Sequence, residues 1–211
     1  TIATTLEKLL NKSGFYVYST KDVMSRVRGG HSFIQIRFGK EPILSHSQPL
    51  DLIIALDQNT IDIHLSDLKE DGIIIADEAL NSNDKRFNPL GLLKIAREFR
   101  LPIVVGTIAC GAVVKHFGID YDQSFSFMDA KFKEEIKDIN KKAFIAGTEL
   151  LDSKYVLGSG SNKNHILIEG NSAIALGAMA AGLSYYSAYP MTRATSIMTY
   201  LAKNQVKAGM V

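Results

Sequence analysis

The sequence predicts an α/β protein, with a three-layer α/β domain followed by the first β–α–β–α part of a second α/β domain. Two nearly all-apolar runs, 51–57 and 73–77, have the pattern of strands that are covered on both faces. A helix-length segment separates them, and this order is typical of a right-handed βαβ unit with parallel strands. A polar stretch at 153–164 interrupts the pattern, and alternating strand and helix signals start again after it.

The segment before the first apolar run predicts a helix and two strands. Apolar side chains recur at helical spacing between Ile2 and Leu10, and Gly14 stands where that helix should end. Residues 15–19 (FYVYS) are aromatic and β-branched, as in a strand. Residues 32–38 alternate between polar and apolar side chains, so they predict a strand with one buried face.

Helices are expected around and after the apolar strands. Residues 59–68 predict a short helix between the two strands. The segment 89–99 begins with proline and has a helical pattern, and 104–118 predicts a helix of small residues that ends at a glycine. Residues 121–150 are rich in Lys and Glu and predict one or two amphipathic helices.

Gly, Ser, Asn and Lys give residues 153–164 the composition of a linker. We therefore expect a domain at 1–152, the linker at 153–164 and the start of a second domain at 165–211. Beyond the linker, the predicted elements are a strand at 165–170, a helix at 171–182, a strand at 184–190 and a helix at 194–204. These elements make up half of a doubly wound domain, which needs a continuation. The chain also begins with Thr inside a helical pattern. We therefore expect a truncated piece of a longer protein.

Composition and charge exclude several classes of protein. Apolar residues make up 46% of the chain and charged residues 22%, which argues against a disordered or fibrous chain. The balance of 24 Lys and Arg against 22 Asp and Glu argues against a nucleic-acid binder. The longest apolar stretches, 103–114 and 174–183, are shorter than the roughly 18–20 residues that span a bilayer, and no signal peptide is visible. We expect a cytoplasmic protein.

Neither a metal site nor a phosphate-binding loop is expected from the spacing of residues. Histidines occur at 31, 46, 64, 116 and 165, and none is spaced as a ligand of another. Cys110 is the single cysteine, which excludes an iron–sulfur cluster held by this chain alone. The nearest glycine pattern, Gly158–Gly160, lies in the predicted linker, where flexibility accounts for it.

A polar loop before the second strand is the first candidate site. Its residues are Ser25, Arg26, Arg28, Gly29 and Gly30. The planar guanidinium of arginine can hold a carboxylate or a phosphate, and glycines allow backbone conformations that are closed to other residues. The alternative is a solvated turn with two surface arginines, and the sequence leaves both interpretations open.

A second candidate loop, 189–196 (YPMTRATS), lies between a predicted strand and a predicted helix. Ligands of open α/β sheets bind beyond the carboxyl ends of strands, which is where this loop falls. Thr192, Thr195 and Ser196 are candidates to cap the following helix, whose free amides suit an anion. Plain helix capping would also account for these residues.

Two parts of the sequence resemble the sequences of one known enzyme family. The stretch 166–204 is similar to the start of the pyrimidine-binding domain in the alpha subunit of 2-oxoacid:ferredoxin oxidoreductases, with its GNEAIALGA-like helix and YPITPS-like loop. Residues 1–150 resemble the gamma domain that many members carry ahead of alpha. The segments behind this second similarity are SRVRGGHSFIQIRFG (25–39), DLIIALD (51–57), GTIACGAV (106–113) and DAKFKEEIKDINKKAFIAG (129–147). The resemblance implies a Rossmann-like gamma domain followed by the first part of a thiamine-pyrimidine-binding domain.

The resemblance also implies a reaction and a site. The reaction is the oxidative decarboxylation of a 2-oxoacid, such as pyruvate or 2-oxoglutarate, to an acyl-CoA, with electrons passed to ferredoxin. Thiamine diphosphate with Mg²⁺ would be shared with a beta subunit, and an iron–sulfur cluster would lie in a partner subunit of the oligomer. Thr192 would be catalytic, donating a hydrogen bond to the substrate. The residues beside it on the thiamine and substrate side would be Tyr189, Pro190, Met191 and Arg193. The loop Ser25–Gly30 would contact coenzyme A or another subunit.

Two residues depart from the family pattern, because Arg193 replaces a proline and Ser172 replaces a common glutamate. The glutamate that activates the thiamine aminopyrimidine would lie beyond Val211, so we expect this chain to be inactive alone. These departures leave open a non-catalytic gamma-like module for dimerisation or docking. A free-standing nucleotide-binding protein is disfavoured, because the glycine fingerprint is missing.

Overall fold

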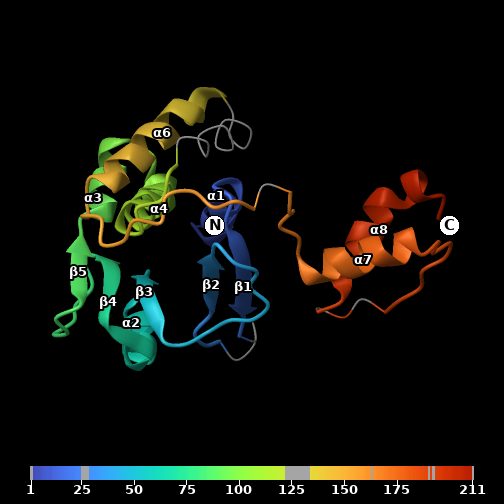
Figure 1. Cartoon of the computed structure of the whole chain (residues 1–211), viewed down its shortest axis with the longest axis horizontal. Coiled ribbons are helices and arrows are strands. Elements are labelled where there is room, and N and C mark those ends of the chain that lie inside the picture. The colour runs from blue at the N-terminus through green and yellow to red at the C-terminus, as the bar shows by residue number, and fades with distance from the viewer. Residues whose placement is uncertain are drawn as a thin grey trace. The chain divides into compact units, whose positions relative to one another are not determined.

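The structure is a computed structural model that describes residues 2–24, 29–121, 134–162, 164–189, 191 and 193–210. It is a mixed α/β structure with a parallel sheet, as predicted. The chain divides into two compact units, residues 1–165 and 166–211, and all strands of the described residues belong to the first unit (Figure 1). Within the described ranges, no helix is both long and apolar enough to cross a membrane.

A helix and a hairpin open the first unit. Helix α1 (Ile2–Lys12) buries its apolar face and ends before Gly14, whose φ of +85° is a left-handed conformation that glycine adopts without strain. Strands β1 (Tyr16–Asp22) and β2 (Phe33–Gly39) pair antiparallel. The predicted helix and both predicted strands are confirmed.

The parallel sheet has the strand order β3–β4–β5. Its strands, with the short helices between the first two, are β3 (Leu50–Ala55), α2 (Gln58–His64), η1 (Leu65–Asp67), β4 (Leu68–Asp77) and β5 (Phe87–Leu90). Strands β3 and β4 pair parallel across the connection through α2, which confirms the βαβ unit. The helix predicted over 89–99 does not begin at Pro89, because Pro89 lies in β5. Strand β5 is at the edge of this sheet, where a residue without an amide hydrogen is tolerated.

Different helices cover the two faces of this sheet. Alternate side chains along a strand point to opposite faces. One set packs with Ile61 of α2 and consists of Ile53, Ala55, Ile74 and Ala76. The intervening set packs with the other helices of the unit and consists of Leu52, Ile54 and Ile75. The sheet therefore lies between two helical layers, as the three-layer prediction requires.

Three helices on the second face pack together (Figure 1). They are α3 (Leu92–Glu98), α4 (Val105–His116), which the turn η2 (Pro102–Val104) precedes, and α6 (Glu134–Thr148). A Cβ at Gly111 would overlap the Phe144 carbonyl, and one at Gly147 would overlap the Ile108 carbonyl. Helices α4 and α6 therefore meet backbone to backbone, which only glycine allows. Part of the helical region predicted at 121–150, residues 122–133, lies outside the described residues.

Residues 153–162, which the composition predicts to be a linker, are held along the first unit by backbone hydrogen bonds. The Tyr155 amide donates to the His116 carbonyl at 3.1 Å, and the Gly160 amide donates to the Ser13 carbonyl at 2.9 Å. These bonds attach residues 153–162 to the ends of α4 and α1, so the segment is part of the first unit. We call residues 153–162 the strap.

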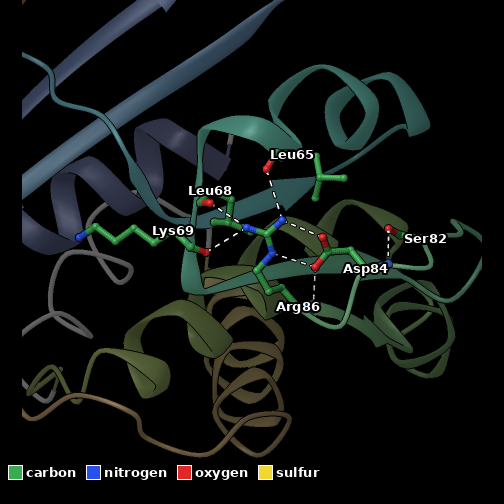
Figure 2. Close-up of polar contacts among 6 residues, drawn as sticks. All are labelled: Leu65, Leu68, Lys69, Ser82, Asp84 and Arg86. Atoms are coloured by element: carbon green, nitrogen blue, oxygen red, sulfur yellow. Dashed lines mark hydrogen bonds and ion pairs between the residues drawn. The ribbon is translucent and has the colours of Figure 1, made fainter.

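A bidentate ion pair orders the loop before β5. Figure 2 shows the Arg86 guanidinium donating to both carboxylate oxygens of Asp84, at 2.8 Å from Nε and 2.7 Å from Nη2. The same guanidinium donates to the carbonyls of Leu68 and Lys69 at 2.7 and 3.0 Å. The hydrogen bonds from Arg86 lower the pKa of Asp84 to about 2. Arg86 thus joins the start of β4 to the start of β5 and is a structural residue.

The second unit contains helices α7 (Gly170–Ala180) and α8 (Thr195–Ala208). They pack against each other around a small core whose buried members are Ala175, Leu201 and Met210. The helices predicted at 171–182 and 194–204 are confirmed.

The strands predicted beside these helices, at 165–170 and 184–190, are wrong for the residues that the structure describes. Neither 165–169 nor 184–189 forms a hydrogen-bonded strand. A parallel strand needs a neighbouring strand for its ladder, and no described residue of this unit supplies one.

Candidate functional site

The start of α8 carries a tight, exposed loop that the Met191 carbonyl organises. This carbonyl accepts the amides of Ala194 and Thr195, both at 2.9 Å, and the Thr195 hydroxyl at 2.7 Å. The Thr195 side chain therefore bonds back to the loop and does not cap the helix, contrary to the prediction. The N-cap residue is Ala194, which has no side-chain oxygen to offer.

The described residues of this predicted site face outward. Tyr189 is 81% exposed and Met191 is 61% exposed, and Arg193 is also exposed. No ion pair of Arg193 occurs within the described part of the chain. Pro190 and Thr192 lie outside the described residues. An exposed aromatic ring, a thioether and an exposed cation in one short loop can contact a ligand or another protein surface.

Asn171, the second residue of α7, ties this loop to the neighbouring helix. Its Nδ2 donates to the Arg193 carbonyl and to the Ser196 hydroxyl, both at 2.7 Å. The sequence signal for this residue is its place in the GNEAIALGA-like helix, and that motif does not reveal partners more than twenty residues away. Asn171 therefore contacts the candidate loop, and sequence reasoning missed this contact.

The first candidate loop is described only at its glycine end. Ser25, Arg26 and Arg28 lie outside the described residues. Gly29 and Gly30 have φ of +68° and +131°, so both use the backbone freedom that the sequence suggested.

His31, directly after these glycines, lies beside His64 of α2. The spacing of histidines along the sequence did not predict this contact. The Nε2 atoms of His31 and His64 are 3.2 Å apart, and the Nδ1 of His64 is 3.3 Å from the Asp67 carboxylate. Phe33 packs against both rings. The pair thus attaches the residue after the loop to the end of α2. In the described ranges, no group of three or more His, Cys, Asp or Glu residues is arranged to hold a metal ion.

A hollow of about 320 Å³ lies elsewhere on the first unit, beside the strap. Its polar lining includes Asn88, His116, Asp152 and Lys154. Burial lowers the pKa of His116, and the Lys154 ammonium lowers it further. The Lys154 ammonium is itself paired with Asp71 at 2.8 Å. None of the predicted site residues lines this hollow.

The model of the pyruvate ferredoxin/flavodoxin oxidoreductase family matches residues 1–150, which is well over half of the sequence. The chain belongs to this family. The match covers the part that the sequence relates to the gamma domain, so this resemblance is confirmed.

Relatives extend the similarity of this family member beyond residue 150. The 2-oxoacid:ferredoxin oxidoreductase alpha subunit of Sulfurisphaera tokodaii is 21% identical over 241 residues, covering 92% of this chain and 38% of the relative. The 2-oxoglutarate synthase subunit KorC of Methanocaldococcus jannaschii is 30% identical over 104 residues, covering 46% of this chain and 56% of the relative. The chain therefore spans well under half the length of the alpha subunits that it matches.

Solved structures show the same fold. A 2-oxoglutarate:ferredoxin oxidoreductase from Magnetococcus marinus, solved with 2-oxoglutarate, coenzyme A and succinyl-CoA bound, superposes with a TM-score of 0.88 at 23% identity. That likeness covers 100% of this chain and 40% of the other. The gamma subunit of a keto/oxoacid ferredoxin oxidoreductase from Geobacter sulfurreducens has a TM-score of 0.58 at 20% identity, covering 70% of this chain and 88% of the other. The two likenesses support the predicted α/β fold.

Proposed function

We propose that this chain is part of a 2-oxoacid:ferredoxin oxidoreductase. Such an enzyme decarboxylates a 2-oxoacid oxidatively to an acyl-CoA and passes the electrons to ferredoxin. The observation that carries the proposal is the family match over residues 1–150, which alpha-subunit relatives extend to 92% of the chain. The chain spans 38% of those relatives, so the activity belongs to the longer, assembled protein. We place that protein in the cytoplasm as an oligomer, and we expect this chain to be inactive alone.

The loop at the start of α8 is the proposed wall of the cofactor and substrate pocket. Its exposed Tyr189 and Met191 fit an apolar cofactor surface, and the exposed Arg193 fits a carboxylate. When bound, thiamine diphosphate with Mg²⁺ supplies the electron sink for decarboxylation. Pro190 would restrict the turn, and Thr192 would donate a hydrogen bond to the 2-oxoacid.

The other parts of the enzyme would come from partner subunits. A beta subunit would supply the opposite wall with the diphosphate and Mg²⁺ ligands, and an iron–sulfur cluster in a partner would lead electrons to ferredoxin. The loop with Ser25, Arg26, Arg28, Gly29 and Gly30 would contact coenzyme A or another subunit. Its glycine conformations and the His31–His64 attachment support a defined loop end at this place.

The full-length polypeptide, assembled with its partner subunit, tests the proposal. We expect it to reduce a viologen dye anaerobically when it is given a 2-oxoacid, coenzyme A and thiamine diphosphate. The control omits thiamine diphosphate, and the panel includes monocarboxylic and dicarboxylic 2-oxoacids. Absence of reduction with every 2-oxoacid would overturn the proposal.

That negative result would favour the second candidate, a non-catalytic gamma-like module for dimerisation or docking. The observation behind this candidate is the departure of Arg193 and Ser172 from the family pattern. Such a module would still associate with the partner subunit in sedimentation experiments while it catalysed nothing.

A further inference from the structure

Asn171 connects the starts of two helices and binds the backbone of the candidate loop. We propose that Asn171 is a positioning residue, which holds the Arg193 carbonyl and so sets the place of the chain at Arg193, directly before α8, relative to α7. This inference rests on the proposed function of the loop.

The geometry uses the full donor capacity of the side chain. An amide Nδ2 carries two hydrogens, and here they reach two acceptors, the Arg193 carbonyl and the Ser196 hydroxyl, at 2.7 Å each. One acceptor belongs to the backbone just before α8, and the other lies in the first turn of that helix. Asn171 therefore determines the position of the chain at the point where it leaves the loop.

Packing alone does not determine this position. The core between α7 and α8 has Ala175, Leu201 and Met210 as buried members among the described residues, and Ile197, its contact in the first turn of α8, is only partly buried. The loop side chains of Tyr189 and Met191 are exposed and add nothing to that core. Apolar contacts hold the helices together, whereas hydrogen bonds place the loop.

The two bonds of Asn171 can be separated by substitution. Asn171→Asp keeps the shape and still accepts a hydrogen bond from the Ser196 hydroxyl, but it has no hydrogen to donate to the Arg193 carbonyl. The new carboxylate would lie in the first turn of α7, where the helix dipole favours it, so the unit should stay folded. Ser196→Ala has the opposite effect, because it removes the second bond and keeps the first.

The experiment measures turnover of 2-oxoacid by the full-length, assembled enzyme. We expect Asn171→Asp to lower kcat about tenfold, which equals about 1.4 kcal/mol in the barrier, with the KM for coenzyme A unchanged. Ser196→Ala should change kcat less than about twofold. Asn204→Asp is the matched control, because the Asn204 amide also donates to a carbonyl of this unit, that of Tyr200 at 2.8 Å, but far along α8.

Hydrogen exchange by mass spectrometry gives a readout that does not depend on activity. Asn171→Asp should speed the exchange of the peptide that covers 189–196 and leave the second half of α8 as in the parent protein. If the parent enzyme turns over and Asn171→Asp matches it in kcat, the inference is overturned and the proposed function stands. If the parent has no turnover, the proposed function fails, and unchanged exchange in 189–196 would then overturn the positioning role as well.

Discussion

At the scale of single residues, His116 shows how its surroundings change an ordinary side chain. It is the last residue of α4, is 5% exposed and has Phe117 and Tyr155 edge-on to its ring. Burial lowers its pKa first, Lys154 lowers it further, and Asp51 raises it. The folded state therefore favours the neutral imidazole.

This shift has a defined consequence for stability. A group whose pKa is lowered by folding contributes stability above its ordinary pKa, here 6.5, and that contribution is lost as the pH falls below this value. We expect the melting temperature of the protein to fall between pH 7 and pH 5.5. His116→Phe keeps the ring packing and removes the titration, so its melting temperature should fall less over the same pH range.

The matched control is His46→Gln, which removes an exposed imidazole. Differential scanning calorimetry across the pH range makes the comparison. If the melting temperature changed with pH in the same way for the parent and for His116→Phe, folding would not change the pKa of His116.

At the scale of elements, the contact between α4 and α6 depends on two glycines. A Cβ at Gly147 would overlap the Ile108 carbonyl, which belongs to a helix backbone and cannot move away cheaply. We expect Gly147→Ala to lower the free energy of unfolding by about 3 kcal/mol. Urea denaturation followed by circular dichroism measures this change.

Gly177 of α7 provides the opposite case, because an added Cβ there would meet nothing within 4 Å. Gly177→Ala should raise helix stability by up to about 1 kcal/mol, since alanine loses less backbone entropy than glycine. If Gly147→Ala and Gly177→Ala had similar effects on stability, the close approach of α4 and α6 would be contradicted.

At the scale of the whole molecule, the two units have very different cores. Two large clusters of buried apolar side chains lie within residues 1–165, whereas the second unit buries three such side chains among its described residues. Chains below about 70 residues rarely gain enough stability from one core. We expect residues 1–165 to unfold cooperatively as an isolated polypeptide, and residues 166–211 to lack cooperative unfolding.

Calorimetry and far-ultraviolet circular dichroism of the two polypeptides test this expectation. The strap belongs to the first unit, so a matched control ends at residue 152 and should be less stable than 1–165. Equal stability of these two polypeptides would show that the strap contributes nothing.

Much of the fold could be predicted from local patterns. Helix α1 ends before Gly14, and the apolar runs around residues 53 and 75 form the parallel strands, as predicted. Pro89 shows the limit of such reasoning, because a proline suits both the start of a helix and an edge strand. The segments at 165–169 and 184–189 show a second limit, since a strand exists only when a neighbour pairs with it.

The candidate site was accessible to sequence reasoning only in part. The loop at Tyr189–Arg193 was predicted from its resemblance to a YPITPS-like motif, and a motif is contiguous. Asn171, in contrast, contacts the loop across 22 positions of the chain, and no spacing rule predicts that distance.

The sequence by itself determined the helices, the buried strands of the first unit and the family, because periodicity, punctuating glycines and contiguous motifs are local properties of a chain. Only the tertiary structure decided which distant residues meet. It joined His31 to His64, placed α4 against α6 at Gly111 and Gly147, and tied the glycine-rich strap to the first unit. The physical reason is that long-range contacts depend on the simultaneous closure of many loops and on shared packing, which no local pattern encodes.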